Sequence, residues 1–262
     1  MNGFFPLAGM GVLVTRPAHQ ATRLCRLLED QGAISFSFPV IEIIDPEDTI
    51  APQAALTRLR QFDLAIFVSP NAVIRAWRWI SVAGGLPPGL TIAAVGQGTA
   101  HELQRLGRQA DLVPEERFDS EALLALPRLT TMKGQRVIIF RGVGGRELLT
   151  DELTRRGASV TNVEVYRRIK PNTDPSELLR RLACNEIHVA VVTSAEGLRN
   201  LLDLVGPVGQ DWLRDTQLVL FSERAVTLAR ELGLRGTIFV AKKATDAAVV
   251  EIIMLNRYHF QR

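Results

Sequence analysis

Cysteine and histidine are scarce in this 262-residue chain, and long apolar runs are missing. The two cysteines, Cys25 and Cys184, lie far apart in the sequence, and the four histidines are scattered. This distribution fits neither a disulfide framework nor a structural zinc site, so we expect no metal. No apolar run reaches the ~18 residues that a membrane span needs. No basic residue precedes Arg16, and no small-residue cleavage pattern follows, so we expect a cytoplasmic protein that does not bind a membrane.

Lysine is also rare, although the chain is slightly basic. Lys and Arg total 31 against 28 Asp and Glu, which gives a net charge of +3, and only four of the basic residues are lysines. So small a surplus predicts no nucleic-acid partner. Arginine forms forked pairs with carboxylates and phosphates, but arginine-rich codon usage explains the same bias. With 47% hydrophobic residues, the chain can fold as one large or two ordinary domains.

Short apolar runs rich in β-branched residues alternate with segments of helical periodicity. The predicted strands cover residues 12–15, 64–68, 91–95, 137–140, 189–192, 218–221 and 237–240. Continuous apolar strands flanked by helices are typical of parallel sheets covered on both faces, so we expect an α/β fold. Glycines just past four helices, at positions 32, 107, 157 and 233, are expected to be left-handed C-caps.

The two halves of the chain match each other at a constant offset of 125 residues. The matched pairs are Arg16 and Arg141, Gly32-Ala33 and Gly157-Ala158, Ser69 and Ser194, and Ser120 and Thr245. The order of the predicted elements agrees as well, so we predict a tandem duplication with two similar domains. Segments 38–43 and 163–169 follow the Gly-Ala turns and alternate like exposed strands. They could pair as a bridge, with both chain ends in one domain. The residues alone leave open a simple split near residue 125.

Polar turns follow the predicted strands, at the end of parallel sheets where ligands bind. These turns cover 14–20, 68–73, 95–100, 140–147, 193–197 and 221–225, and they are rich in Gly, Ser, Thr, Asn and Arg. Helix N-termini favour anions, and Ser69 before Pro70 is a typical N-cap that Ser194 repeats. Serine and threonine cap helices without any ligand, but six such turns in two domains favour a site for a polyanion.

The turn 140–147 also permits a dinucleotide-binding interpretation. Gly142, Gly144 and Gly145 follow a strand and precede a helix, and Glu164 lies at a suitable distance to meet a ribose. The expected third glycine is Glu147, whose carboxylate would face the pyrophosphate. Arg141 and Arg146, for their part, suit free carboxylates as well as phosphates, so we disfavour a nucleotide.

Familiar catalytic groupings are missing from the sequence, which has no Gly-x-Ser-x-Gly elbow and no Gly-Lys-Ser/Thr phosphate loop. Tyr166, one of two tyrosines, lies in the expected interdomain strand. Its ring can pack at a hinge, or its hydroxyl can act as an acid or an orienting donor. The chemistry alone slightly favours packing.

Eight segments, taken in order, carry a resemblance to a known family. They read LVTRPA, FVSPNAV, AVGQGTA, FDSEALLALP, RGVGGRELLTDELTRRGA, VEVYRR, VTSAEGLRNL and TDAAVV. Over nearly its whole length the chain resembles the uroporphyrinogen-III synthase family. The resemblance implies two α/β domains joined by a two-stranded bridge. One domain would comprise residues 1–37 and 170–262 and the other residues 44–162, with strand linkers at 38–43 and 163–169.

The resemblance also implies a reaction. The family's substrate is hydroxymethylbilane, a linear tetrapyrrole with eight carboxylates. The enzyme eliminates its hydroxyl as water, inverts the last pyrrole ring through a spiro intermediate and closes the macrocycle, with no metal or organic cofactor. We therefore expect a monomeric lyase of haem biosynthesis that makes a transient contact with hydroxymethylbilane synthase. The alternative is a module that binds a small anion or a tetrapyrrole without catalysis.

Site residues follow from the matching segments. Tyr166 matches the family's bridge tyrosine and is the expected catalytic residue, which helps the hydroxyl to leave. The expected substrate-binding residues are Arg16, Ser69, Asn71, Gly96, Thr99, Arg141, Arg146, Ser194 and Ser222. The turn at Ser222 departs from the family, because Glu223 and Arg224 follow where relatives have other small or polar residues. An acidic side chain there repels a polycarboxylate unless it points away or pairs.

Overall fold

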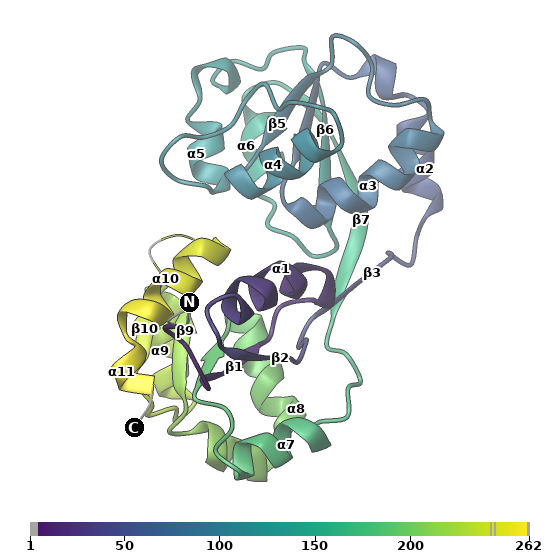
Figure 1. The fold of residues 1–262 in the computed structure, drawn as a ribbon. Helices are drawn as coiled ribbons and strands as arrows, with labels where there is room; N and C mark the ends of the chain where they lie inside the picture. Colours follow the sequence, from purple (N-terminus) through teal and green to yellow (C-terminus); the bar gives the residue numbers. More distant parts are fainter. Residues whose placement is uncertain (1–4, 242, 244, 261–262) are drawn as a thin grey trace. The chain divides into compact units, whose positions relative to one another are not determined.

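The computed structural model describes residues 5–241, 243 and 245–260, so the outermost ends of the expected discontinuous domain lie outside the described residues. The chain divides into two compact units (Figure 1). Unit 1 combines residues 1–42 with 169–262, and unit 2 comprises residues 43–168. None of the described helices is both long and apolar enough to cross a membrane.

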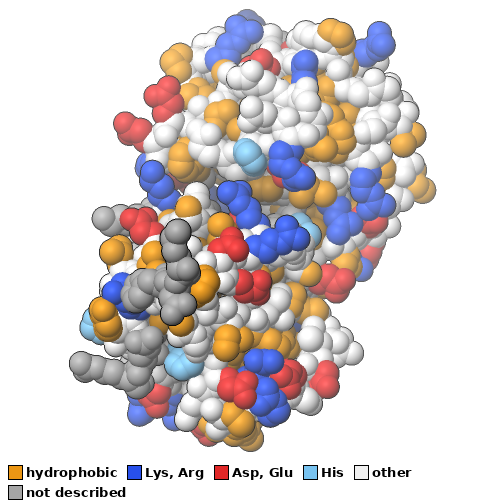
Figure 2. Space-filling view, viewed as in Figure 1, with side chains coloured by type: hydrophobic (Ala, Val, Ile, Leu, Met, Phe, Trp, Pro, Cys, Tyr) orange, Lys and Arg blue, Asp and Glu red, His pale blue; other side chains and the backbone are white. Residues whose placement is uncertain are grey.

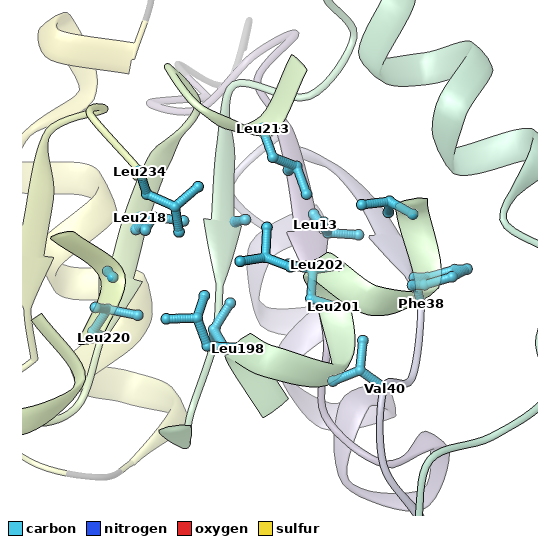
Figure 3. Packing of buried hydrophobic residues seen from close by; sticks show 14 of the residues in the cluster. Leu13, Phe38, Val40, Leu198, Leu201, Leu202, Leu213, Leu218, Leu220 and Leu234 are labelled. Atoms are coloured by element: carbon cyan, nitrogen blue, oxygen red, sulfur yellow. The ribbon is translucent and has the colours of Figure 1, made fainter. Parts of the chain in front are cut away.

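Unit 1 is built on a five-stranded parallel sheet with the order β10-β9-β8-β1-β2. Its elements are β1 (Gly11–Val14), α1 (Ala18–Glu29), β2 (Ile34–Ser37), α7 (Ser176–Ala183), β8 (Val189–Val191), α8 (Ala195–Leu213), β9 (Gln217–Leu220), α9 (Glu223–Glu231), β10 (Ile238–Val240), α10 (Asp246–Leu255) and α11 (Arg257–Phe260). Two-residue alternation sends successive strand side chains to opposite faces. Leu13 therefore packs with α8 on one face (Figure 3), and Val12 packs with α1 and α10 on the other.

Unit 2 has a five-stranded sheet with the order β3-β7-β6-β4-β5. Its elements are β3 (Glu42–Ile44), which begins at the unit boundary, α2 (Ile50–Leu56), η1 (Leu59–Gln61), β4 (Leu64–Phe67), α3 (Pro70–Val82), β5 (Thr91–Ala94), α4 (Gln97–Arg105), α5 (Ser120–Leu124), η2 (Pro127–Leu129), β6 (Arg136–Gly142), α6 (Leu148–Arg155) and β7 (Ser159–Ile169). Strands β4 to β7 are parallel. Ile66 and Ile139 face α5 and α6, whereas the stacked rings of Phe67 and Phe140 lie 4.7 Å apart on the opposite face.

The predicted α/β fold with two parallel-sheet domains is confirmed, and each of the seven strands predicted from apolar runs is present to within a residue or two of its expected ends. The glycines at 32, 107, 157 and 233 all have the positive φ expected of C-caps. The sequence reading missed β2, whose ISFS sequence alternates polar and apolar residues without a long apolar run.

Both expected linker segments differ from plain connecting strands. In segment 38–43, Phe38 and Val40 are buried in the core of unit 1, and strand β3 begins only at Glu42 (Figure 3). Segment 163–169 is the second half of β7, which pairs with β6 as far as Tyr166. Buried apolar side chains in one segment and a continued ladder in the other explain both differences.

The two sheets repeat each other along the chain. Strands β1 and β6 begin 125 residues apart, as do β2 and β7, and β4 and β8. The order β2-β1-β8-β9 of unit 1 therefore corresponds to the order β7-β6-β4-β5 of unit 2. Each sheet takes two of these strands from each half of the chain, so each unit is a mixture of both repeats.

Candidate functional site

Eight of the ten expected site residues lie just past the carboxyl ends of parallel strands or in the first turn of the following helix. The other two, Arg141 and Tyr166, lie in the last pairs of the β6–β7 ladder. Seven belong to unit 2: Ser69, Asn71, Gly96, Thr99, Arg141, Arg146 and Tyr166. Three belong to unit 1: Arg16, Ser194 and Ser222. We call the first set the unit 2 edge and the second set the unit 1 edge.

A hydroxyl pair forms the centre of the unit 2 edge. The Oγ atom of Ser69 lies 3.1 Å from the hydroxyl oxygen of Tyr166, and either group can donate the hydrogen bond. Ser69 also caps α3, because its Oγ accepts the backbone N–H of Ala72 at 3.1 Å. The Tyr166 hydroxyl therefore meets the positive end of a helix dipole, where an anion or a developing negative charge is stabilised.

A β-bulge delivers the Tyr166 side chain to this position. Arg141 pairs with Glu164 in the β6–β7 ladder, but the next residue, Gly142, pairs with Tyr166, so Val165 is the extra residue. Val165 and Tyr166 are both buried, although consecutive strand residues normally face opposite sides. Bulges re-aim side chains beside functional sites, and they are rare between parallel strands.

The start of α4 lies beside the start of α3. A Cβ atom on Gly98 would touch the ring of Pro70 at 3.6 Å, and one on Gly96 would come within 3.1 Å of Phe118. Thr99 is buried in the first turn of α4, and Asn71 is half-buried in the first turn of α3. Two helix N-termini, each the positive end of a helix dipole, therefore lie side by side at the unit 2 edge.

Arg141 is buried and forms its bonds within its own loop. Its guanidinium donates to both carboxylate oxygens of Glu147, at 3.0 and 2.8 Å, and to the carbonyl of Gly145. This bond is the chief reason why the pKa of Glu147 lies below its ordinary value. The Val143 amide donates to the backbone carbonyl of Tyr166, and the Gly145 amide donates to the backbone carbonyl of Gly142. These internal bonds, with Glu147 at the start of α6, argue against a phosphate cradle and hence against the dinucleotide interpretation.

Arg146 is exposed and pairs with Glu121 on α5, with 2.6 Å between Nη2 and Oε1. The hydrogen bond from Arg146 is the main cause that lowers the pKa of Glu121. This pair joins the loop before α6 to the first turn of α5.

The unit 1 edge contains an arginine that is likewise paired with an acid. Arg16 binds the Asp246 carboxylate at the start of α10, and both side chains are nearly buried. The Arg16 guanidinium also lies 5.5 Å from the centre of the Phe221 ring, a cation–π distance. Asp246 therefore neutralises the positive charge of Arg16, which the sequence analysis expected to bind a ligand.

The two serines of the unit 1 edge are both helix caps. Ser194 accepts the Gly197 amide at 3.0 Å, and Ser222 accepts the Ala225 amide at 3.3 Å. Glu223 and Arg224 are exposed beyond Ser222, and Glu223 lies in the first turn of α9, where an acidic residue suits the helix dipole. The departure at this turn is therefore compatible with the helix.

Four contributors to these edges were missed by sequence reasoning. Glu147, Glu121 and Asp246 pair with the three candidate arginines, and Gly142 lies against Tyr166. Two of them carried a signal, because Glu147 replaced an expected glycine and Gly142 is a glycine of the turn 140–147. The Asp246 pairing spans 230 residues and has no local sequence signature.

The charged side chains of the described residues form no metal cluster. No group of three or more His, Cys, Asp or Glu side chains within the described ranges could hold a metal ion. On the face drawn in Figure 2, basic and acidic side chains are interspersed. Unit 2 also has a groove of about 650 Å³ beside β7, whose lining includes Val143, Glu164 and Arg167. What the edges offer chemically is a set of hydroxyls, backbone amides and one buried phenol.

Comparison with known proteins gives a consistent result. The model of the family described as uroporphyrinogen-III synthase HemD matches residues 22–251. The uroporphyrinogen-III synthase of Escherichia coli K12 is 37% identical over 248 residues, which cover 93% of this chain and all of that protein. The corresponding protein of Synechococcus elongatus is 32% identical over 214 residues, 79% of each chain.

Solved structures are similar in fold at low sequence identity. A mutant uroporphyrinogen-III synthase of the extremely thermophilic bacterium Thermus thermophilus gives a TM-score of 0.60 at 18% identity and covers 96% of this chain and 99% of its own. The structure of the Helicobacter pylori 26695 uroporphyrinogen-III synthetase gives 0.59 at 16% identity, with 94% and 99% covered. These structures support the two-domain α/β fold.

Proposed function

This chain belongs to the uroporphyrinogen-III synthase family, and we propose that it cyclises hydroxymethylbilane to uroporphyrinogen III. As a member of that family it is a hydro-lyase of tetrapyrrole biosynthesis. The observation that carries the proposal is the 37% identity to the Escherichia coli enzyme along the whole of that enzyme. The reaction loses one water and inverts ring D, and it needs no net oxidation or reduction.

We assign to Tyr166 the role of helping the substrate hydroxyl to leave. The pyrroles of the bilane supply the electrons that expel the hydroxyl, so the protein has only to hydrogen-bond the leaving oxygen and to position the last ring. The contact with Ser69 and the start of α3 support this role, because they fix the phenol and stabilise negative charge on it. The buried ring holds the hydroxyl in one place.

Substrate carboxylates are assigned first to hydroxyl and amide donors at the two edges. These are Ser69, Asn71, Gly96 and Thr99 in unit 2, and Ser194 and Ser222 in unit 1. Arg16, Arg141 and Arg146 keep a proposed binding role, but each already carries a carboxylate of the protein. Their charge is therefore largely offset before a substrate arrives, and the helix N-termini provide the remaining attraction for eight carboxylates.

We further propose that residues 1–37 with 170–262, and residues 44–162, act as two domains around the segments at 38–43 and 163–169. The division into two compact units supports this arrangement, with boundaries a few residues away. A cytoplasmic, monomeric enzyme without a cofactor, in transient contact with hydroxymethylbilane synthase, also remains our prediction.

A coupled assay tests the activity. Purified protein is added to hydroxymethylbilane synthase and porphobilinogen, and the oxidised uroporphyrin isomers are separated by chromatography. Without a synthase the bilane closes spontaneously to isomer I. A dose-dependent shift to isomer III supports the proposal. Isomer I alone, from protein with a normal circular dichroism spectrum, would overturn it and favour the binding module.

A further inference from the structure

Gly142, which follows Arg141 of the unit 2 edge, leaves almost no room for a side chain because the Tyr166 ring lies against it. A Cβ atom built on Gly142 would lie 2.7 Å from two carbons of the Tyr166 ring, Cε2 and Cζ, and 3.1 Å from its hydroxyl oxygen. An ordinary Cβ contact begins at 3.4 Å. Any side chain at position 142 therefore forces the phenol to move by about 0.7 Å, the difference between these distances.

The phenol has little room for such a shift. Tyr166 is 5% exposed, and its hydroxyl is already 3.1 Å from Ser69. The bulge at Val165 fixes the backbone of Tyr166 opposite Gly142. The Tyr166 carbonyl also accepts the amide of Val143 at 2.8 Å, which ties the residue after Gly142 to the same strand. A displaced ring would therefore lose its alignment with Ser69 and α3.

We propose that Gly142, together with the bulge opposite it, is the positioning residue for the Tyr166 hydroxyl. The proposal rests on the function proposed above for this chain. Gly142 makes no contact with the substrate in this role; its missing side chain leaves the space in which the phenol ring lies. The bulge and Gly142 act together, because a change in either one alters where the Tyr166 hydroxyl points.

A double-mutant cycle on kcat tests this. Gly142→Ala should lower kcat about tenfold to a hundredfold, because a misplacement near 1 Å is costly, and should change KM less than twofold. In a Tyr166→Phe background the hydroxyl is already missing, so adding Gly142→Ala should change kcat by less than about twofold. An equal loss of kcat in both backgrounds would overturn the proposal, because Gly142 would then act without the hydroxyl.

A matched control separates positioning from general strain. Gly209 on α8 of unit 1 is equally crowded, since a Cβ atom there would lie 2.5 Å from the Cβ of Val205 and 2.6 Å from Cδ2 of Leu179. Gly209→Ala should lower the melting temperature, but its effect on kcat should be the same with Tyr or Phe at position 166. A Gly209→Ala effect that also vanishes in the Phe background would contradict the specific role of Gly142.

A second measurement does not depend on activity. The chain has two tyrosines, Tyr166 and the exposed Tyr258, so protein labelled with ¹³Cζ-tyrosine gives two resonances, which Tyr258→Phe assigns. Gly142→Ala should shift the Tyr166 resonance in the same direction as Ser69→Ala, and Gly209→Ala should leave it in place. An unmoved resonance in folded Gly142→Ala protein would refute the positioning role even if the isomer III assay succeeds. If that assay fails for the wild type, the resonance still reports the geometry.

Discussion

The two edges follow the same repeat pattern, yet some of their matching positions differ in chemistry. Ser69 and Ser194 are 125 residues apart, and both cap a helix through the same side chain-to-backbone bond. At the same offset, however, Tyr166 corresponds to Ile41, and Gly142 corresponds to Pro17. The duplicated scaffold thus keeps its helix caps in both units, whereas the phenol and the glycine that admits it occur in unit 2.

The strands at these positions end differently. Pro39 occupies the position that corresponds to Glu164, and the residues on either side of it, Phe38 and Val40, donate their amides to the carbonyls of Val14 and Thr15. Strand β2 ends at Ser37, while β7 continues to Ile169 and carries the bulge. Phe38 and Val40 are buried in unit 1 (Figure 3), and the matching residues Val163 and Val165 are buried in unit 2. Both repeats therefore use these positions for packing, and they differ at the next residue, which is Ile41 in unit 1 and Tyr166 in unit 2.

The largest effect should come from removing the group that distinguishes the edges. We expect Tyr166→Phe to lower the rate of isomer III formation at least about tenfold, the scale of a lost proton donor. The fold should survive, because the ring remains. Ile41→Leu, a volume-conserving change at the matching position of unit 1, should leave the rate nearly unchanged. Equal rates for Tyr166→Phe and the wild type in initial-rate assays would remove Tyr166 from the mechanism.

The cores of the two units provide the next comparison. Phe67 and Phe140 stack in unit 2, where unit 1 has Val192 and Thr15. Phe67→Ala should destabilise unit 2 by about 3–5 kcal/mol, the usual cost of truncating a buried phenylalanine. Val192→Ala removes fewer atoms and should destabilise unit 1 by roughly half as much. Hydrogen exchange under native conditions measures the loss of unfolding free energy in each unit. A larger loss for Val192→Ala than for Phe67→Ala would contradict this comparison.

The acids that pair with Arg16 and Arg141 differ in burial between the edges, which gives a third test. The Arg16 and Asp246 side chains are 12% and 13% exposed, whereas Glu147 is 58% exposed beside the buried Arg141. Asp246→Asn should therefore cost about 1.5–3 kcal/mol of unfolding free energy, as for a charged hydrogen bond with little solvent. Glu147→Gln should cost less, because water can replace the lost carboxylate contact. Urea unfolding of both variants decides the order, and a greater loss for Glu147→Gln would reverse the comparison.

Local pattern was enough to predict most of the fold, whereas the contacts within the site depend on tertiary pairing. The run at 137–140 and the Ser69-Pro70 cap are local signals, and both were interpreted correctly. The Arg16–Asp246 pair and the contact of Gly142 with Tyr166 depend on which strands become neighbours. The bulge at Val165 has no local signal either, because it arises only when β7 is placed against β6. The site's geometry therefore follows from the sheet order.

The smallest expected effect concerns acid stability at the end of α6. Glu152 accepts hydrogen bonds from Arg155 and Arg156, which lower its pKa from 4.5 to about 2. The matching position on α1 is Leu27, which cannot titrate. Because the folded pKa lies below the unfolded one, the unfolded state binds the proton first as the pH falls.

The stabilisation by Glu152 is therefore complete above about pH 4.5 and is lost as the pH falls towards 2. Glu152→Gln should remove this part of the acid sensitivity of unit 2 and leave unit 1 unchanged. The effect should be small, since the pair with the exposed Arg155 is screened by water and salt, and Arg156 keeps its bonds to the carbonyls of Leu124 and Leu129. Hydrogen exchange in each unit between pH 5 and 2.5 measures it. A variant that keeps the wild-type slope in unit 2 would show that other carboxylates, such as Glu121 and Glu147, dominate its acid response.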